Sequence, residues 1–240
     1  MRIDVLTLFP EMFESPLNHS ILKRAQEQGI VEIALWNIRD FTTDKYRKVD
    51  DKPYGGGPGM VMMCQPVFEA FRYVRAAAAE PGRVLLLSPQ GRLFTQEKAV
   101  SLSREPRLIL IAGRYEGFDE RIRIGLGAEQ LSIGDYVLTG GELPAMVVID
   151  AVVRLLDGAL GDGASAADES FSEGLLEYPQ YTRPEEFEGM KVPDILLSGD
   201  HGRIAQWRNQ QRIERTRQFR PDLWEQYEAR KKNRKDSETQ

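Results

Sequence analysis

Residues 108–117 read LILIAGRYEG, which joins five consecutive apolar residues to a loop containing two glycines. A short apolar run of this kind is typical of a strand buried in a sheet. Glycine in the loop that follows allows the backbone to approach a ligand closely. Ligands of open α/β sheets bind at the carboxyl ends of the strands. The loop Gly113–Gly117 is therefore a predicted part of a binding site.

Three further apolar runs predict other strands of the same sheet. They are Ile3–Phe9, Val31–Ile38 and Val84–Ser88. Segments with helical apolar spacing alternate with these runs. They are Pro16–Gln28, ended by Gly29, Pro66–Ala79, ended by Pro81-Gly82, and Gln96–Ser103. This alternation predicts an α/β fold with a mainly parallel sheet.

The segment Leu143–Leu156 is apolar on nearly every face. Pro144 lies near its start, where the missing N–H of proline costs little. We expect a helix that is buried on all sides. Either the interior of this chain or a second subunit provides that burial.

The stretch 157–168, DGALGDGASAAD, is rich in glycine and small residues and has no apolar periodicity. Such a composition predicts a flexible linker. We expect one domain of residues 1–160, a linker of residues 161–172 and a small helical domain of residues 173–240. In the last of these, Ser198 or Asp200 is suited to cap a helix that continues through Gln211.

The net charge of −5 is unevenly distributed along the chain. Residues 201–240 contain 11 Lys and Arg against 6 Asp and Glu, whereas residues 1–200 contain 21 against 31. A basic segment on an acidic body is either a solvated helix face or a surface that contacts phosphates. Charge alone leaves both interpretations open.

Several classes of protein are disfavoured by what the sequence lacks. No window approaches the roughly 20 apolar residues of a membrane helix, and Met1–Pro10 has no signal-peptide pattern. Cys64 has no partner for an internal disulfide, so we expect a cytoplasmic protein that does not bind a membrane. With two histidines, His19 and His201, a zinc site or a Cys/His nucleophile is not expected. The P-loop, the GxGxxG turn and the serine hydrolase elbow are also missing.

Two more loops are dense in glycine. Tyr54–Met60, YGGGPGM, follows a basic stretch that contains Lys45, Arg47 and Tyr46. Lysine and arginine suit phosphates and tyrosine stacks on bases, although a plain surface turn is the alternative. Ile133–Glu142, IGDYVLTGGE, has three glycines and neither lysine nor arginine. That loop suits an uncharged heterocycle and a ribose better than a triphosphate.

Six runs of sequence resemble the bacterial tRNA (guanine-N1)-methyltransferase family, in the order of that family. They are Leu8–Phe13, Val49–Met60, Leu87–Arg92, Gly113–Arg121, Ser132–Met146 and Tyr181–Met190. The resemblance implies the SPOUT class of methyltransferases, with a deep trefoil knot that is an exception to the rule against knots. It also implies a homodimer that methylates tRNA with S-adenosylmethionine and releases S-adenosylhomocysteine. A magnesium requirement is left open.

The resemblance also implies which residues bind. For S-adenosylmethionine they are Pro89, Gly113, Glu116, Ser132, Ile133, Gly134, Asp135, Tyr136, Val137, Leu138, Gly140, Gly141 and Pro144. For tRNA they are Lys45, Arg47, Arg114, Tyr115, Arg203, Arg208 and Arg212. No cluster of metal ligands is visible in the sequence.

Methylating N1 of guanine requires a positioned methyl group, removal of the N1 proton and stabilisation of negative charge on O6. Arg154 matches the family's catalytic arginine and is expected to serve O6, with an ion pair to Asp150 as the structural alternative. The family's general base is an aspartate directly before Ser-Phe. This chain has Glu169 there, preceded by Asp168. The base is therefore either Glu169, which we favour, or Asp168.

A base on the linker implies a further expectation, that Ala164–Glu169 closes over the site when tRNA binds. The resemblance implies that the target is the guanosine immediately 3′ to the anticodon, and methylation at N1 is preferred because a carboxylate base suits an N–H proton. Two other functions compete with this one. The first is a knotted methyltransferase that acts on ribosomal RNA or on a ribose hydroxyl, and the second is a non-catalytic RNA-binding module.

Overall fold

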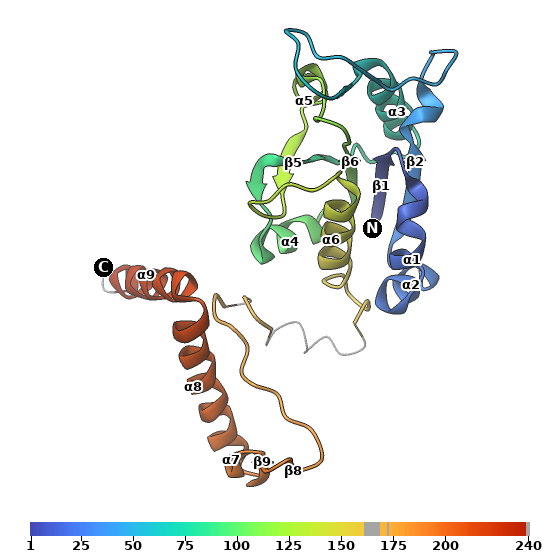
Figure 1. Ribbon diagram of the computed structural model, residues 1–240. Helices are drawn as coiled ribbons and strands as arrows, with labels where there is room; N and C mark the ends of the chain where they lie inside the picture. The colour runs from blue at the N-terminus through green and yellow to red at the C-terminus, as the bar shows by residue number, and fades with distance from the viewer. Residues whose placement is uncertain (161–168, 172, 239–240) are drawn as a thin grey trace. The chain divides into compact units, whose positions relative to one another are not determined.

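The computed structural model describes residues 1–160, 169–171 and 173–238, the last six of them by backbone only. The chain divides into two compact units, Met1–Gly163 and Ala164–Gln240. The first unit contains a five-stranded sheet, and the second is mainly helical (Figure 1).

The sheet of the first unit has the order β2-β1-β6-β5-β7, and every pairing in it is parallel. Its strands are β1 (Arg2–Thr7), β2 (Glu32–Asn37), β5 (Arg83–Leu93), β6 (Arg107–Ala112) and β7 (Glu129–Ser132). The predicted α/β fold with a mainly parallel sheet is confirmed. Strand β7 was not predicted, because its sequence EQLS contains a single large apolar residue.

Helices cover both faces of this sheet (Figure 1). Side chains of β6 alternate between the faces: Leu108 and Leu110 join one buried cluster, while Ile109 and Ile111 join the other. The first cluster lies under α1 (Glu14–Leu17), α2 (Ser20–Glu27), α4 (Gln96–Ser103) and α6 (Glu142–Val153). The second lies under α3 (Cys64–Ala76) and α5 (Glu120–Leu126). Shorter elements of this unit are η1 (Pro10–Phe13), η2 (Ile38–Phe41), β3 (Asp50–Asp51) and β4 (Val61–Met62).

A buried ion pair joins β1 and β6 in the part of the sheet near their amino ends. Arg107 Nε donates to Asp4 Oδ2 at 2.8 Å, and neither side chain is exposed. Burial alone would raise the pKa of Asp4, but hydrogen bonds from Arg2, Trp36 and Arg107 hold this pKa below its ordinary value. Arg107 also donates to the carbonyls of Val74 and Glu80, which lie in and just after α3. This contact fixes α3 against the sheet.

Two predicted helices differ from the observed ones. The segment Pro16–Gln28 is two helices, α1 and α2, because Asn18 donates its side-chain amide to the Glu14 carbonyl at 2.7 Å and ends the first. The helix predicted over Pro66–Ala79 begins earlier, at Cys64, and ends at Ala76. The helix predicted over Gln96–Ser103 is confirmed as α4.

Within one chain, the segment Leu143–Leu156 is not buried on all sides, so the predicted burial of its whole surface would need the second subunit. Helix α6 buries Ala145, Val148 and Ile149 against the sheet. Leu143 and Val147, on its other side, remain 50% and 45% exposed. A helix that packs on a sheet needs apolar residues on one face only. The apolar residues on the other face of α6 are therefore not explained by its packing on the sheet.

The second unit consists of β8 (Glu186–Phe187), β9 (Met190–Lys191), α7 (Asp194–Leu197), α8 (His201–Phe219) and α9 (Pro221–Glu238). Asp200 caps α8 by accepting a hydrogen bond from the Arg203 N–H at 3.0 Å. This settles the choice between Ser198 and Asp200. None of the helices in the described ranges is long and apolar enough to cross a membrane.

Candidate active site

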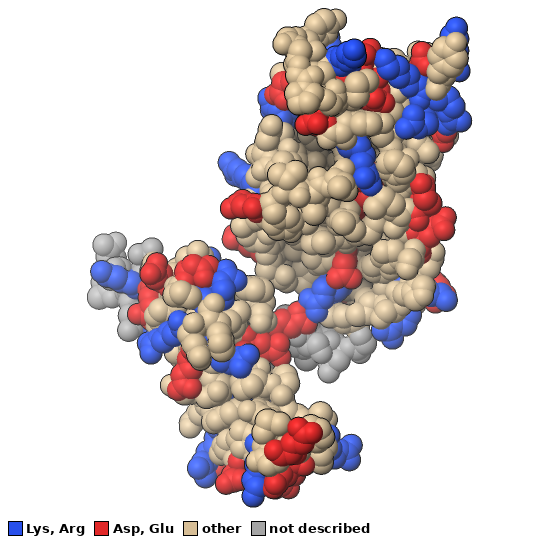
Figure 2. Space-filling view, viewed as in Figure 1, with Lys and Arg blue, Asp and Glu red and all other residues tan. Residues whose placement is uncertain are grey.

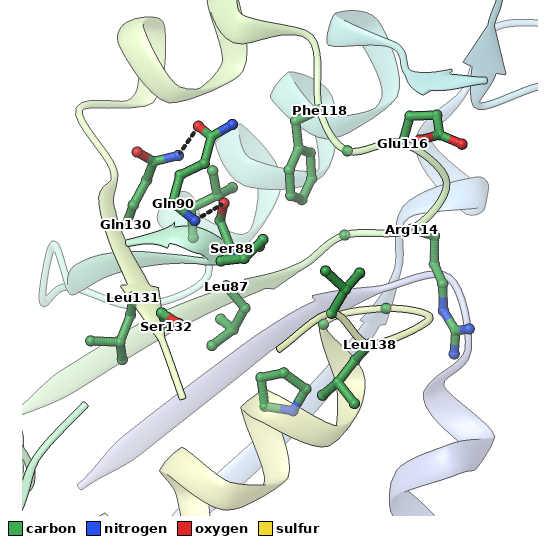
Figure 3. A pocket seen from close by; sticks show the side chains of 18 of the residues that line it. Leu87, Ser88, Gln90, Arg114, Glu116, Phe118, Gln130, Leu131, Ser132 and Leu138 are labelled. Atoms are coloured by element: carbon green, nitrogen blue, oxygen red, sulfur yellow. Dashed lines mark hydrogen bonds between the residues drawn. The ribbon is translucent and has the colours of Figure 1, made fainter. Parts of the chain in front are cut away.

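A cavity lies at the carboxyl ends of β5, β6 and β7 (Figure 3). Its volume of about 280 Å³ is near the roughly 300 Å³ at which small-molecule sites begin. Figure 3 shows Leu87, Ser88 and Gln90 of β5 beside Gln130, Leu131 and Ser132, with Phe118 and Leu138 across the cavity. The cavity therefore lies at the ends of the strands, where the sequence predicts a binding site.

Twelve of the thirteen residues predicted to contact the cofactor line this cavity. They are Pro89, Gly113, Glu116, Ser132, Ile133, Gly134, Tyr136, Val137, Leu138, Gly140, Gly141 and Pro144. The exception is Asp135, which is exposed in a bend of the loop and does not line the cavity. Sequence reasoning missed other lining residues, among them Gln90, Phe118 and Gln130. Gln90 and Phe118 lie within the quoted motifs and Gln130 lies just before one, but none of them carries chemistry that marks it in the sequence.

The loop between β7 and α6 rests directly on the end of β6. The Gly141 N–H donates to the Gly113 carbonyl at 2.8 Å. A Cβ atom at Gly141 would lie 2.8 Å from both Ala112 Cα and Gly113 N, which is closer than real Cβ contacts. A Cβ atom at Gly113 would overlap the ring of Phe118. Glycine at 141 is therefore required for the loop to rest on β6, and glycine at 113 leaves room for the Phe118 ring.

The loop Gly113–Gly117 also contacts the glycine-rich loop Tyr54–Met60. The Glu116 N–H donates to the Met60 carbonyl at 2.9 Å, and the Glu116 side chain occupies the space that a Cβ of Gly59 would need. Tyr115 has a positive φ of +63. Burial raises the pKa of its hydroxyl, the hydrogen bond with Arg39 lowers this pKa, and the hydrogen bond with Asp50 raises it. Two loops predicted separately as binding elements thus contact each other, although only Gly113–Gly117 lines the cavity.

Arg114 and Glu142 form a buried ion pair beneath the cavity loop. Arg114 Nε lies 2.9 Å from Glu142 Oε2, and Glu142 also accepts a hydrogen bond from Thr7 Oγ1 at 2.9 Å. The Arg114 side chain is 18% exposed, and its guanidinium lies 4.6 Å above the ring of Phe9. A Cβ at Gly140 would overlap both partners of the ion pair. These contacts give Arg114 a structural role in holding the loop, and its contact with RNA stays a prediction.

Glu142 was missed in the sequence, and its contacts allow a prediction. Glu142→Gln is expected to weaken binding of S-adenosylmethionine about tenfold, because it leaves the largely buried Arg114 guanidinium without its carboxylate partner. A loss of about 1.4 kcal/mol in cofactor binding corresponds to that factor of ten. Titration calorimetry measures this change. Glu97→Gln removes the same charge from an exposed position of α4 and serves as the control. Equal affinities of the two variants would show that the ion pair does not hold the loop.

The basic stretch before Tyr54 is an exposed surface. Lys45 lies 4.7 Å from the centre of the Tyr46 ring, and Arg47 is paired with Asp40. Tyr54 is 99% exposed. Figure 2 shows Lys and Arg side chains gathered at this end of the first unit. Lys45 is therefore available for phosphate contact, whereas Arg47 would first have to release a carboxylate.

The predicted basic contacts of the second unit differ in their surroundings. Arg203 and Arg208 are exposed on α8, and the Arg208 guanidinium lies 4.6 Å from the centre of the Tyr178 ring. Arg212 is 11% exposed, with Nη1 2.9 Å from Glu173 Oε2. Arg212 is thus held inside the unit, which disfavours its predicted role as a tRNA contact.

The predicted catalytic residues belong to the two different units. Arg154 is half-buried at the end of α6, where its N–H donates to the Asp150 carbonyl at 3.2 Å. Glu169 is half-buried in the second unit. Asp168 and the rest of the segment predicted to close, residues 164–168, lie outside the described residues. In the described part of the chain, no three His, Cys, Asp or Glu residues are grouped to hold a metal ion.

Comparison with known proteins gives a consistent set of relatives. Residues 1–226 match the family described as tRNA (Guanine-1)-methyltransferase TrmD. A tRNA (guanine-N(1)-)-methyltransferase of Geobacillus kaustophilus is 59% identical over 228 residues, which cover 95% of this chain and 93% of the relative. Proteins of the same name from Desulforamulus reducens and Staphylococcus epidermidis are each 56% identical. They cover 98% and 100% of this chain and 93% and 97% of the relatives.

Proposed function

The chain belongs to the tRNA (guanine-1)-methyltransferase family, and we propose that it methylates N1 of the guanosine immediately 3′ to the anticodon. It is an enzyme that modifies tRNA and uses S-adenosylmethionine, as methyltransferases of this family do. The observation that supports methyl transfer by this chain is the glycine-lined cavity at the strand ends, which is lined by twelve of the predicted cofactor contacts.

The cavity suits S-adenosylmethionine in shape and charge. Its walls combine apolar side chains with polar ones such as Gln90 and Gln130, and the backbone of its glycine loops offers N–H and C=O groups to an adenine and a ribose. Glu116 lines the cavity and favours a cationic sulfonium. When bound, the cofactor supplies an electrophilic methyl group. Its product, S-adenosylhomocysteine, lacks the positive charge and is held less strongly by that carboxylate.

The protein's own residues supply the remaining chemistry. Glu169 accepts the N1 proton as the methyl group arrives, which leaves the electron pair of N1 free to form the new bond. Negative charge then develops on O6, and Arg154 donates hydrogen bonds to it. Glu169 removes the proton from N1 and Arg154 stabilises the charge on O6 while the same N–C bond forms. Both side chains are therefore needed in one step.

We also propose a homodimer in the cytoplasm with the trefoil knot of the SPOUT class. Leu143 and Val147 on α6 support the dimer, because a second copy would cover these half-exposed apolar side chains. Lys45, Tyr115, Arg203 and Arg208 are the proposed tRNA contacts, all of them at least partly accessible. A magnesium requirement stays a prediction from the sequence.

Transfer of tritiated methyl groups to two tRNA transcripts tests the proposed target. One transcript carries guanosine immediately 3′ to the anticodon, and the other carries adenosine there. Stoichiometric incorporation is expected in the first and none above background in the second, because adenine N1 has no proton for a base to remove. Equal incorporation in both transcripts, or no incorporation in either of them, would contradict the proposal.

A further inference from the structure

After Glu169, hydrogen bonds join residues 170–171 to residues 174–177 in a turn within the second unit. Ser170 Oγ accepts a hydrogen bond from the Glu177 N–H at 3.0 Å. The Phe171 N–H donates to the Leu175 carbonyl at 2.8 Å, and Leu175 is buried. The two ends of the turn, at residues 170 and 177, are thereby held together. Glu169 is directly bonded to one of these ends.

Helix α8 holds this turn through a buried threonine. The Leu176 N–H donates to Thr216 Oγ1 at 2.8 Å, and the same hydroxyl donates to the Arg212 carbonyl at 2.7 Å. The single proton of the hydroxyl is used by the carbonyl, so its lone pair is directed to Leu176. Thr216 is the one buried polar residue in the part of the second unit that the structure describes.

An ion pair on the same helix holds the turn at a second point. Arg212 Nη1 lies 2.9 Å from Glu173 Oε2, and the arginine is largely buried while the glutamate is exposed. Thr216 and Arg212 lie four residues apart on α8 and therefore on one face of the helix. Both contact the segment 173–176, so that face of α8 fixes the turn next to Glu169.

We propose that Thr216, assisted by Arg212, is a positioning residue for methyl transfer, because it fixes the turn that presents the Glu169 carboxylate. The proposal rests on the proposed function of Glu169 as the base. Two hydrogen bonds connect Thr216 to Ser170, the neighbour of Glu169. The Leu176 N–H donates to Thr216, and the N–H of the next residue, Glu177, donates to Ser170. A displacement of about 1 Å at a reacting group can cost on the order of a hundredfold in rate. The second unit thus takes part in catalysis as well as in tRNA binding.

Two substitutions at Thr216 provide the test. Thr216→Val removes the hydroxyl and keeps the shape, whereas Thr216→Ser keeps the hydroxyl. Single-turnover methyl transfer is measured with full-length protein at saturating tRNA and S-adenosylmethionine, together with both dissociation constants. Thr216→Val is expected to slow transfer about tenfold and to leave both dissociation constants unchanged. This loss is smaller than the roughly hundredfold loss for a displacement of about 1 Å, because the turn keeps its other contacts. Thr216→Ser is expected to match the original protein.

A second variant keeps the proposal testable if Thr216→Val does not fold. Glu173→Gln weakens the ion pair from its exposed side and is expected to slow transfer in the same way but to a smaller degree. Glu225→Gln removes an equal charge from an exposed position of α9 and is expected to change nothing. Thermal unfolding of each variant confirms that the protein is folded.

Combining Thr216→Val with Glu169→Asp separates this proposal from the one on which it rests. If Thr216 acts through the carboxylate at 169, the two rate losses are not additive. Additive losses, an unchanged rate in folded Thr216→Val, or a loss confined to tRNA affinity would each overturn the positioning role. Failure of the unsubstituted protein to methylate tRNA would instead refute the proposed function.

Discussion

Glu169→Ala is expected to lose most methyl transfer while its affinity for S-adenosylmethionine stays unchanged. The substitution removes the carboxylate that accepts the N1 proton, and a positioned general base contributes roughly 10²–10⁴-fold to a rate. Glu169 lies in the second unit, whereas every residue of the cofactor cavity lies in the first. Catalysis and cofactor binding should therefore separate in this variant. Single-turnover transfer of tritiated methyl groups and titration calorimetry measure the two quantities.

Asp168→Ala is the matched control, because it removes the neighbouring carboxylate. It is expected to lose much less activity than Glu169→Ala. The opposite ranking would move the role of the base to Asp168, and full activity of both variants would remove the linker carboxylates from the mechanism.

Gly141→Ala is expected to weaken S-adenosylmethionine binding by roughly tenfold to a hundredfold, since overpacking a filled site costs about 1–3 kcal/mol. The added Cβ would lie 2.8 Å from Ala112 Cα and Gly113 N, which are backbone atoms at the end of β6 and cannot turn away. Gly141 has φ −84, which alanine adopts freely, so the effect comes from space and not from backbone strain.

Gly202→Ala provides the comparison for this prediction. A Cβ there would lie 3.5 Å from Asp200 Oδ1, an ordinary contact in a helix outside the cavity. Calorimetry should find its cofactor affinity unchanged. An unchanged affinity in Gly141→Ala as well would mean that the loop does not rest on β6 when the cofactor is bound.

The strands that sequence predicts well are those with continuous apolar runs. β1 and β6 lie inside the sheet and are largely buried, whereas β2 is a half-buried edge strand whose apolar run still marks it in the sequence. β7 could not be predicted, because its EQLS sequence becomes a strand through pairing with Leu85–Leu87, more than forty residues earlier. The one-sided burial of α6 was equally hidden, since an all-apolar helix does not reveal which face meets the sheet.

The candidate site was predictable where glycine marks it. The loop at Gly113 lines the cavity, as its position after a predicted strand indicated, and the loop at Gly140, marked by its glycines alone, lines the same cavity. The supports of the site were not predictable, because they join residues far apart in sequence. Thr7 and Glu142 are separated by 135 positions, and Thr216 contacts Leu176 across 40. Neither Glu142 nor Thr216 has a local sequence pattern that distinguishes it from an ordinary polar residue.

The identity of the methylated nucleoside tests the central claim most directly. A tRNA transcript treated with the protein and S-adenosylmethionine is digested to nucleosides, which are separated and identified by mass, and partial digestion locates the modified position. The account predicts 1-methylguanosine immediately 3′ to the anticodon and at no other position. A methyl group on a ribose hydroxyl, on another atom of the guanine, or at another position of the tRNA would contradict it.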